Sequence, residues 1–274
     1  MIRLENVSYI YPHKTKPALK NVTLDIKKGE FLGIVGRNGS GKSTLAQLLN
    51  GMIVPNFGQV IVDDLNTRSK LEQIKIRQKV GLLLPSPDNQ IIFNIVEEDV
   101  AFGPENLGWS SSEIRYRVDL ALKMVLMEEF KKHPPYLLSG GQKQKVALAG
   151  LIAMNPQYLV LDEPTSMLDF QAQAELIETI LNIKKETNMS IIMITHDLSE
   201  IKNADKILIL DDGVIKRIIK PEELYQYTDE LETYGIEQLD LINFTSQLKK
   251  QGVVNLTDGL LTVDDLVNEL CRLK

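Results

Sequence analysis

The sequence predicts an α/β protein built around a parallel sheet, and three features lead to this prediction. Two apolar runs have the length and composition of buried strands, and each is followed directly by polar residues. A third such run is followed by a glycine-rich loop and then by a helix pattern. The carboxyl ends of parallel strands meet at one edge of a sheet, so we expect the polar residues to come together there.

The glycine-rich loop follows the apolar run 31–35 and leads into the helix pattern 45–49. Glycine allows successive backbone N–H groups to turn toward phosphate oxygens, next to the positive end of the helix. Lys42 supplies a positive charge for the outer phosphates, and Ser43 a hydroxyl for magnesium. The residues expected to bind the phosphates are Gly36, Asn38, Gly39, Ser40, Gly41, Lys42, Ser43 and Thr44.

A pair of acidic residues, Asp162 and Glu163, follows the apolar run 158–161. Successive residues of a strand face opposite sides, so the carboxylates of Asp162 and Glu163 point apart. We expect Asp162 to hold Mg²⁺ and Glu163 to act as the general base toward an attacking water.

His196 directly follows the apolar run 190–195, which is rich in β-branched residues. Its place at a strand end predicts a contact with the terminal phosphate or with the water beside Glu163. The other histidines, His13 and His133, lie in polar stretches that contain proline, and we interpret both as surface residues.

A second glycine-containing string, Leu-Ser-Gly-Gly-Gln at 138–142, is not part of the phosphate-binding loop at 36–44. Together with that loop, the acidic pair and His196, it resembles the signature motif of ABC-transporter nucleotide-binding subunits, and the match runs through most of the chain. The resemblance implies that two subunits share each ATP and its Mg²⁺, because the signature of one closes over the phosphate loop of the other. The residues implied to reach the partner's ATP are Ser139, Gly140, Gly141 and Gln142.

The same resemblance implies further contacts. Tyr11 would stack on the adenine ring, with Tyr9 the less favoured candidate, since an aromatic face accepts a base without reading it closely. Asp169 would lie in the loop that crosses the dimer interface.

One position departs from the family pattern. The family normally places a glutamine after the strand that leaves the core, and this chain has Pro85 there. Proline offers no side-chain donor or acceptor, so it can neither bind magnesium nor orient water. Gln90 is a possible substitute ligand. We therefore expect a weakened site in this chain and a heterodimer with two unequal ATP sites, with a homodimer as the alternative.

Three stretches, 87–90, 96–106 and 262–267, indicate a subtype. They resemble ATPases of energy-coupling factor (ECF) importers, which take up vitamins or cobalt and nickel ions. This resemblance implies a second ATPase subunit, a substrate-binding membrane protein, and a transmembrane scaffold protein that docks near residues 90–102. The chain would lie peripherally on the cytoplasmic face of the cell membrane.

The organisation implied by the resemblance has four parts. These are a P-loop (RecA-like) α/β core, an antiparallel β subdomain, an α-helical signature subdomain and a small C-terminal helical domain. We expect the nucleotide-binding domain at 1–219, with its helical subdomain at about 91–153, where apolar residues from Ile114 through Leu126 to Phe130 have helical spacing. The tail, 220–274, reads as a helical dimerisation domain, with Leu239 on a helix and Thr262 as a cap.

Composition limits the alternatives. With 274 residues, 43% of them hydrophobic, the chain can bury a sizeable core, and its net charge of −6 argues against nucleic acid as a partner. The single Cys271 excludes an internal disulfide. A soluble ABC ATPase of repair or translation usually has two cassettes or a coiled-coil insertion, and neither pattern occurs here. A weakly active regulatory half of a heterodimeric ATPase is supported by Pro85 alone.

Overall fold

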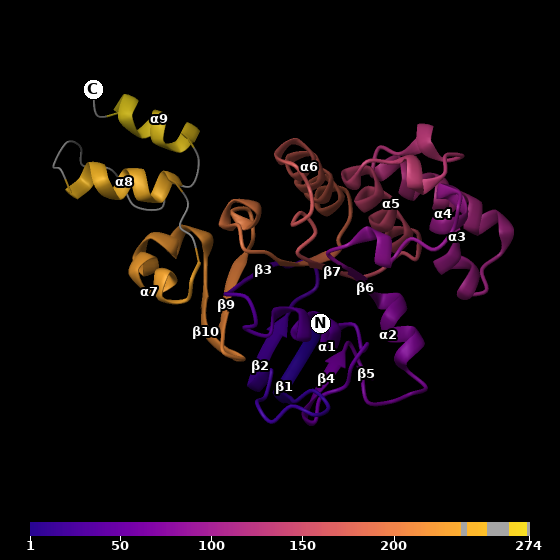
Figure 1. Cartoon of the computed structure of the whole chain (residues 1–274), viewed down its shortest axis with the longest axis horizontal. Coiled ribbons are helices and arrows are strands. Elements are labelled where there is room, and N and C mark those ends of the chain that lie inside the picture. The colour runs from indigo at the N-terminus through magenta and orange to yellow at the C-terminus, as the bar shows by residue number, and fades with distance from the viewer. Residues whose placement is uncertain (237–239, 251–262, 273–274) are drawn as a thin grey trace.

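The computed structural model describes residues 1–236, 240–250 and 263–272, and has the predicted α/β fold (Figure 1). The expected helical position of Leu239 and the expected cap at Thr262 lie outside the described residues. Two sheets and their covering helices make up most of the described chain.

The larger sheet carries the site. Five of its strands are mutually parallel, and the strand at one edge runs antiparallel to its neighbour. In spatial order they are β10 (Val214–Ile219), β9 (Lys206–Asp211), β3 (Phe31–Val35), β8 (Ser190–Ile194), β7 (Tyr158–Asp162) and β6 (Val80–Leu83).

Both faces of this sheet are buried, which explains the unbroken apolar runs. In β3, Phe31 and Val35 face one hydrophobic core, while Leu32 and Ile34 face the other. The alternation follows from the two-residue period of a strand. Parallel strands held in this way place the residues after β3, β7 and β8 at one edge of the sheet.

The smaller sheet is antiparallel and shares the second core with α1 (Lys42–Leu49). Its strands in spatial order are β2 (Leu19–Ile26), β1 (Ile2–Tyr9), β4 (Phe57–Val62) and β5 (Leu65–Asn66). The short helix α2 (Gln73–Lys79) leads from this sheet into β6.

Helices α3 to α6 contribute to the core on the opposite face of the larger sheet. They are α3 (Val96–Asn106), α4 (Ser111–Met124), α5 (Gly140–Ala153) and α6 (Phe170–Glu186). Short 3₁₀ turns lie between the main elements: η1 (Pro87–Asn89), η2 (Glu128–Phe130), η3 (Pro135–Leu137) and η4 (Leu198–Ile201).

The helix in the structure is shorter than the stretch of helical spacing from Ile114 to Phe130. Helix α4 ends at Met124, and Leu126 adopts a φ of 60° with a side chain that is 74% exposed. A left-handed backbone conformation cannot continue a right-handed helix. Leu126 and Phe130 therefore keep the apolar spacing of a helix although α4 has already ended.

Helix α7 (Thr228–Thr233) lies beside β10, and the C-terminal helices lie on the side of the molecule opposite to α3, α4 and α5 (Figure 1). They comprise η5 (Pro221–Tyr227), α7, α8 (Asp240–Lys250) and α9 (Val263–Arg272). An ion pair of 3.2 Å between Arg217 on β10 and Glu230 on α7 links this region to the sheet. The role of this C-terminal region in dimerisation stays a prediction.

Asp63 links the two sheets and carries a stability prediction. Its carboxylate accepts hydrogen bonds from Lys79 at 2.7 Å and from the Tyr158 hydroxyl at 3.0 Å, and it pairs with Lys28 at 3.3 Å. Burial acts to raise the pKa of Asp63, but these donors outweigh it and hold the pKa well below its usual range. We expect Asp63→Asn to lower the free energy of unfolding at neutral pH by about 1–3 kcal/mol.

The sign of the pH dependence follows from the lowered pKa. The stabilisation from Asp63 is complete above the ordinary carboxyl pKa of about 4 and is lost as the pH falls toward the pKa in the folded state. Denaturant unfolding should therefore show a larger deficit at neutral pH than at about pH 3. Exposed Asp64 provides the matched control, Asp64→Asn. Equal deficits at both pH values, or an equal effect of the control, would contradict the prediction.

Candidate phosphate-binding and catalytic site

The glycine loop joins β3 to α1 and lies against two other segments. A Cβ atom on Gly36 would lie 2.0 Å from the Leu210 carbonyl oxygen, and one on Gly41 would lie 2.5 Å from the Ala18 carbonyl oxygen. Gly41 also has a φ of 105°, which other residues rarely adopt. The glycines are therefore required by the close approach of β9 and of the segment that enters β2.

Lys42 lies inside this loop, with only 4% of the residue exposed. Its Nζ donates to the carbonyl oxygens of Gly36 at 2.7 Å and Arg37 at 3.2 Å. Burial lowers the pKa of Lys42, while the negative charges of Glu163 and Asp162 act in the opposite direction. The loop thus surrounds a buried cationic group with backbone, as an anion-binding site requires.

Ser43 and Asp162 meet beside the loop, where the Ser43 hydroxyl donates to Asp162 Oδ1 at 3.2 Å. Burial raises the pKa of Asp162, and the hydrogen bond from Ser43 opposes this. A hydroxyl and a carboxylate oxygen are ligands that Mg²⁺ accepts, and it takes its other ligands from water and substrate phosphates. The pair fits the predicted magnesium site. Within the described ranges, no group of three or more His, Cys, Asp or Glu residues could hold a metal ion.

Glu163 and His196 form a second pair, contributed by the neighbouring strands β7 and β8. Glu163 Oε1 lies 2.7 Å from His196 Nε2. The chain turns sharply at Glu163, with a φ of 48°, and its N–H donates to the Ile194 carbonyl oxygen at 2.9 Å. Lys42 Nζ lies 3.4 Å from His196 Nε2 and 3.9 Å from Glu163 Oε1. The structure thus brings the phosphate loop and the predicted base together.

Tyr11 lies next to the start of α1. Its hydroxyl is 3.1 Å from Thr44 Oγ1, and its ring packs edge-on against Tyr9 with the centroids 4.9 Å apart. Tyr9 is buried, with 8% exposure, whereas Tyr11 is 37% exposed. Of the two tyrosines, Tyr11 therefore has the more accessible ring beside the loop.

The signature string occupies the start of α5. Ser139 caps this helix, since its hydroxyl accepts from the Gln142 N–H at 3.2 Å and Gln142 Oε1 accepts from the Ser139 N–H at 2.9 Å. Ser139 and Gly140 are exposed. A Cβ on Gly141 would lie 2.9 Å from Ala172 Cβ, so α5 packs closely on α6. Across the described part of the chain, no hydrogen bond joins 138–142 to its own phosphate loop.

Asp169 caps α6, where its carboxylate accepts from the Ala172 N–H at 2.9 Å. The neighbouring Met167 and Phe170 are 65% and 86% exposed. Asp169 thus lies on an apolar, solvent-facing turn at the end of the loop that begins at Glu163.

The Gln90 side chain bonds to the backbone of the strand β6 and the residue after it. Its Oε1 accepts from the Leu84 N–H at 2.8 Å, and its Nε2 donates to the Leu82 carbonyl oxygen at 3.1 Å. Both polar atoms of the Gln90 amide are thus engaged by the backbone, while its oxygen keeps a second lone pair. A role of Gln90 as a magnesium ligand stays a prediction.

Several contacts near the site are not evident from the sequence. Arg37, within the glycine loop, pairs with Asp211 at 2.7 Å. Gln144 on α5 donates to the Leu84 carbonyl oxygen at 3.1 Å, so the signature helix contacts the residue that precedes Pro85. The glycine-loop motif could have indicated Arg37 as a residue of the site. Nothing in the sequence around Gln144 indicates its contact with Leu84.

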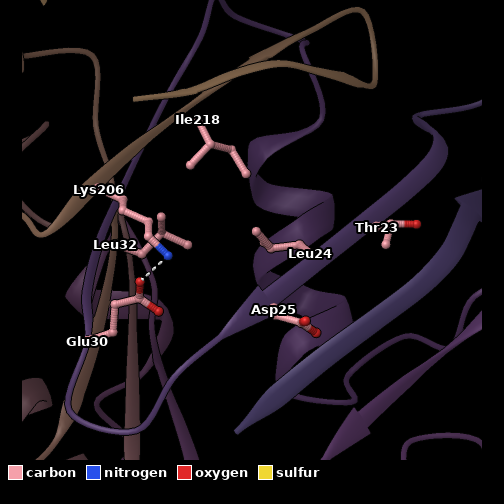
Figure 2. Close-up of a pocket in the computed structure, with 7 residues that line it drawn as sticks. All are labelled: Thr23, Leu24, Asp25, Glu30, Leu32, Lys206 and Ile218. Carbon is pink, nitrogen blue, oxygen red and sulfur yellow. Dashed lines mark ion pairs between the residues drawn. The ribbon is translucent and has the colours of Figure 1, made fainter. Parts of the chain in front are cut away.

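A separate pocket lies between β2 and β10, and Figure 2 shows the ion pair of 2.8 Å between Glu30 and Lys206 inside it. These two residues stand at the amino ends of β3 and β9, opposite to the phosphate loop. None of the predicted site residues lines this pocket. The candidate site thus lies away from this pocket, at the edge of the sheet where β3, β7 and β8 end.

Comparison with known proteins agrees with this geometry. Residues 19–166 match the family model described as ABC transporter. This chain belongs to the ABC transporter family. It is 49% identical over 272 residues to an energy-coupling factor transporter ATP-binding protein, EcfA, of Syntrophomonas wolfei, covering 99% of each chain. It is 45% identical over 275 residues to EcfA1 of Caldanaerobacter subterraneus, again covering 99% of each chain.

Solved structures of family members are also similar. The structure of cbiO1 from Clostridium perfringens, part of the ABC transporter complex cbiONQ, has a TM-score of 0.77 and 34% identity, covering 89% of this chain and 98% of that one. The dimeric ATP-binding cassette MJ0796 bound to ADP and Pi has a TM-score of 0.73 and 33% identity, covering 81% and 99%. These findings confirm the resemblance to ABC and ECF ATP-binding proteins. No helix among the described residues is long and apolar enough to cross a membrane.

Proposed function

We propose that this chain is the ATP-hydrolysing subunit of an energy-coupling factor importer for a vitamin or a transition-metal ion. It pairs with a second ATPase subunit, and ATP-driven closure of the pair moves a transmembrane scaffold protein and a substrate-binding membrane protein. The chain works at the cytoplasmic face of the membrane. The full-length similarity to ECF ATP-binding proteins supports this assignment.

One observation carries the paired arrangement. The signature residues Ser139 and Gly140 are exposed at the positive end of α5 and make no hydrogen bond to the phosphate loop of their own chain among the described residues. A helix N-terminus with free N–H groups suits an anion. The phosphate that it contacts is therefore supplied by ATP on the partner subunit.

Binding of ATP rearranges groups that are already in place. The phosphate oxygens replace the carbonyl oxygens of Gly36 and Arg37 as hydrogen-bond acceptors for Lys42 Nζ. Tyr11 stacks on the adenine. Ser43 and Asp162 would hold Mg²⁺, which would supply positive charge for the phosphate oxygens. Glu163 then accepts a proton from the attacking water, and His196, 2.7 Å from its carboxylate, orients the base and contacts the terminal phosphate.

Copurification tests the assignment. The tagged full-length chain is isolated in mild detergent from membranes of its own organism, and the bound proteins are identified by mass spectrometry. We expect a second ATPase subunit and membrane-spanning proteins, and we expect the complex to hydrolyse ATP. Recovery with ribosomes or DNA, or without any membrane protein, would instead support a soluble ABC ATPase.

Pro85 favours a second candidate, a weakly active half of a heterodimeric ATPase. In that case the signature residues of this chain serve the partner's site, while its own site turns over slowly. The rate of the isolated homodimer separates the two candidates, because a weak half gives little hydrolysis without its partner.

A further inference from the structure

A buried carboxyl group lies close to the Glu163–His196 pair and has no part in the mechanism above. Glu200, on η4, is 7% exposed. Its Oε1 accepts a hydrogen bond of 2.6 Å from the Thr165 hydroxyl. Its Oε2 is buried and has no hydrogen-bond partner among the described residues. Burying a carboxyl oxygen without a hydrogen-bond partner costs free energy.

Glu200 joins the same two loops as the proposed catalytic pair. Thr165 follows Glu163 in the loop after β7, and Glu200 follows His196 in the segment after β8. The loops are therefore linked twice, at 2.7 Å by Glu163 and His196 and at 2.6 Å by Thr165 and Glu200. The Thr165 carbonyl oxygen also accepts from Gln173 Nε2 at 3.2 Å, which fixes Thr165 to α6.

The surroundings of Glu200 favour its neutral form. Burial raises the pKa of Glu200, and the negative charges of Asp197 and Glu163 act in the same direction. The nearby hydroxyls of Thr165 and Thr195 act in the opposite direction. The direct link of Glu200 to the loop after β7 is the hydrogen bond that it accepts from Thr165.

We propose that Glu200 is a positioning residue for ATP hydrolysis, whose bond to Thr165 holds the loop after β7 so that Glu163 faces His196. The proposal rests on the proposed role of Glu163 as base. Catalysis is sensitive to small displacements of reacting groups, so a loosened loop lowers the rate without removing any group that binds ATP.

Single-turnover hydrolysis in the purified complex tests this role. We expect Thr165→Val and Glu200→Ala each to lower the rate constant about tenfold and to leave the Kd for ATP unchanged, because the phosphate loop is untouched. The double variant should be no slower than either single variant, since both remove one bond. Glu200→Gln keeps the acceptor oxygen and should restore the rate to within about twofold of the wild type.

Thr179→Val is the matched control. Thr179 is 4% exposed, like Thr165, but its hydroxyl donates to the Glu175 carbonyl oxygen within α6, at 2.8 Å. A Thr165→Val rate equal to that of the control, or a parallel loss of ATP affinity, would overturn the proposal.

Amide hydrogen exchange separates this proposal from the proposed function. Exchange in residues 163–169 should rise in Thr165→Val and Glu200→Ala but not in Glu200→Gln or in the control. If the wild-type complex hydrolyses no ATP, the proposed function fails, while exchange still decides whether Glu200 holds the loop. Unchanged amide exchange in Thr165→Val would show that Glu200 does not hold the loop.

Discussion

Glu163→Gln is expected to lower the rate of ATP hydrolysis by about a hundredfold or more, because a carboxamide cannot accept the proton that a general base removes. The substitution keeps an oxygen that can still accept from His196 Nε2, 2.7 Å away. It also removes a negative charge 3.9 Å from Lys42 Nζ, next to the place of the terminal phosphate. We therefore expect tighter ATP binding and a closed dimer that persists.

The measurement pairs ATP turnover with the dimeric state by size-exclusion chromatography in the presence of ATP and Mg²⁺. Glu186→Gln, at the exposed end of α6, removes the same charge elsewhere and should leave both unchanged. The assignment of the base fails if Glu163→Gln turns over normally in a complex whose other subunit is also disabled.

Pro85→Gln is expected to raise turnover of the homodimer by roughly ten- to a hundredfold, the range corresponding to one recovered contact of about 1–3 kcal/mol. The backbone around this position is already held, because Gln90 bonds to the N–H of Leu84 and Gln144 to its carbonyl oxygen. A glutamine at this position adds a donor and an acceptor without requiring Gln90 to move.

Pro85→Ala is the control for this gain, since it removes the rigid ring and adds no amide. Its turnover should match that of the wild type. A wild-type homodimer that is already as fast as Pro85→Gln, or an equal gain in Pro85→Ala, would exclude a site weakened by the missing glutamine.

The sequence was informative where chemistry depends on a local string of residues. The glycine loop, Asp162, Glu163 and His196 follow buried strands, and parallel pairing brings strand ends to one edge whatever the details of packing. Helix ends were less predictable, because the apolar spacing that includes Leu126 continues past the left-handed turn where α4 stops.

By itself, then, the sequence predicted the kind of fold, the phosphate loop and, through the resemblance to ABC subunits, a second subunit to use the signature. Only the tertiary structure decided which polar side chains near the site are already engaged in hydrogen bonds. Gln90 is engaged by the backbone of Leu82 and Leu84, and Glu200 is joined to Thr165 across 35 positions of the chain. Hydrogen bonds between distant segments depend on packing and leave no local pattern in the sequence, so only the folded chain reveals them.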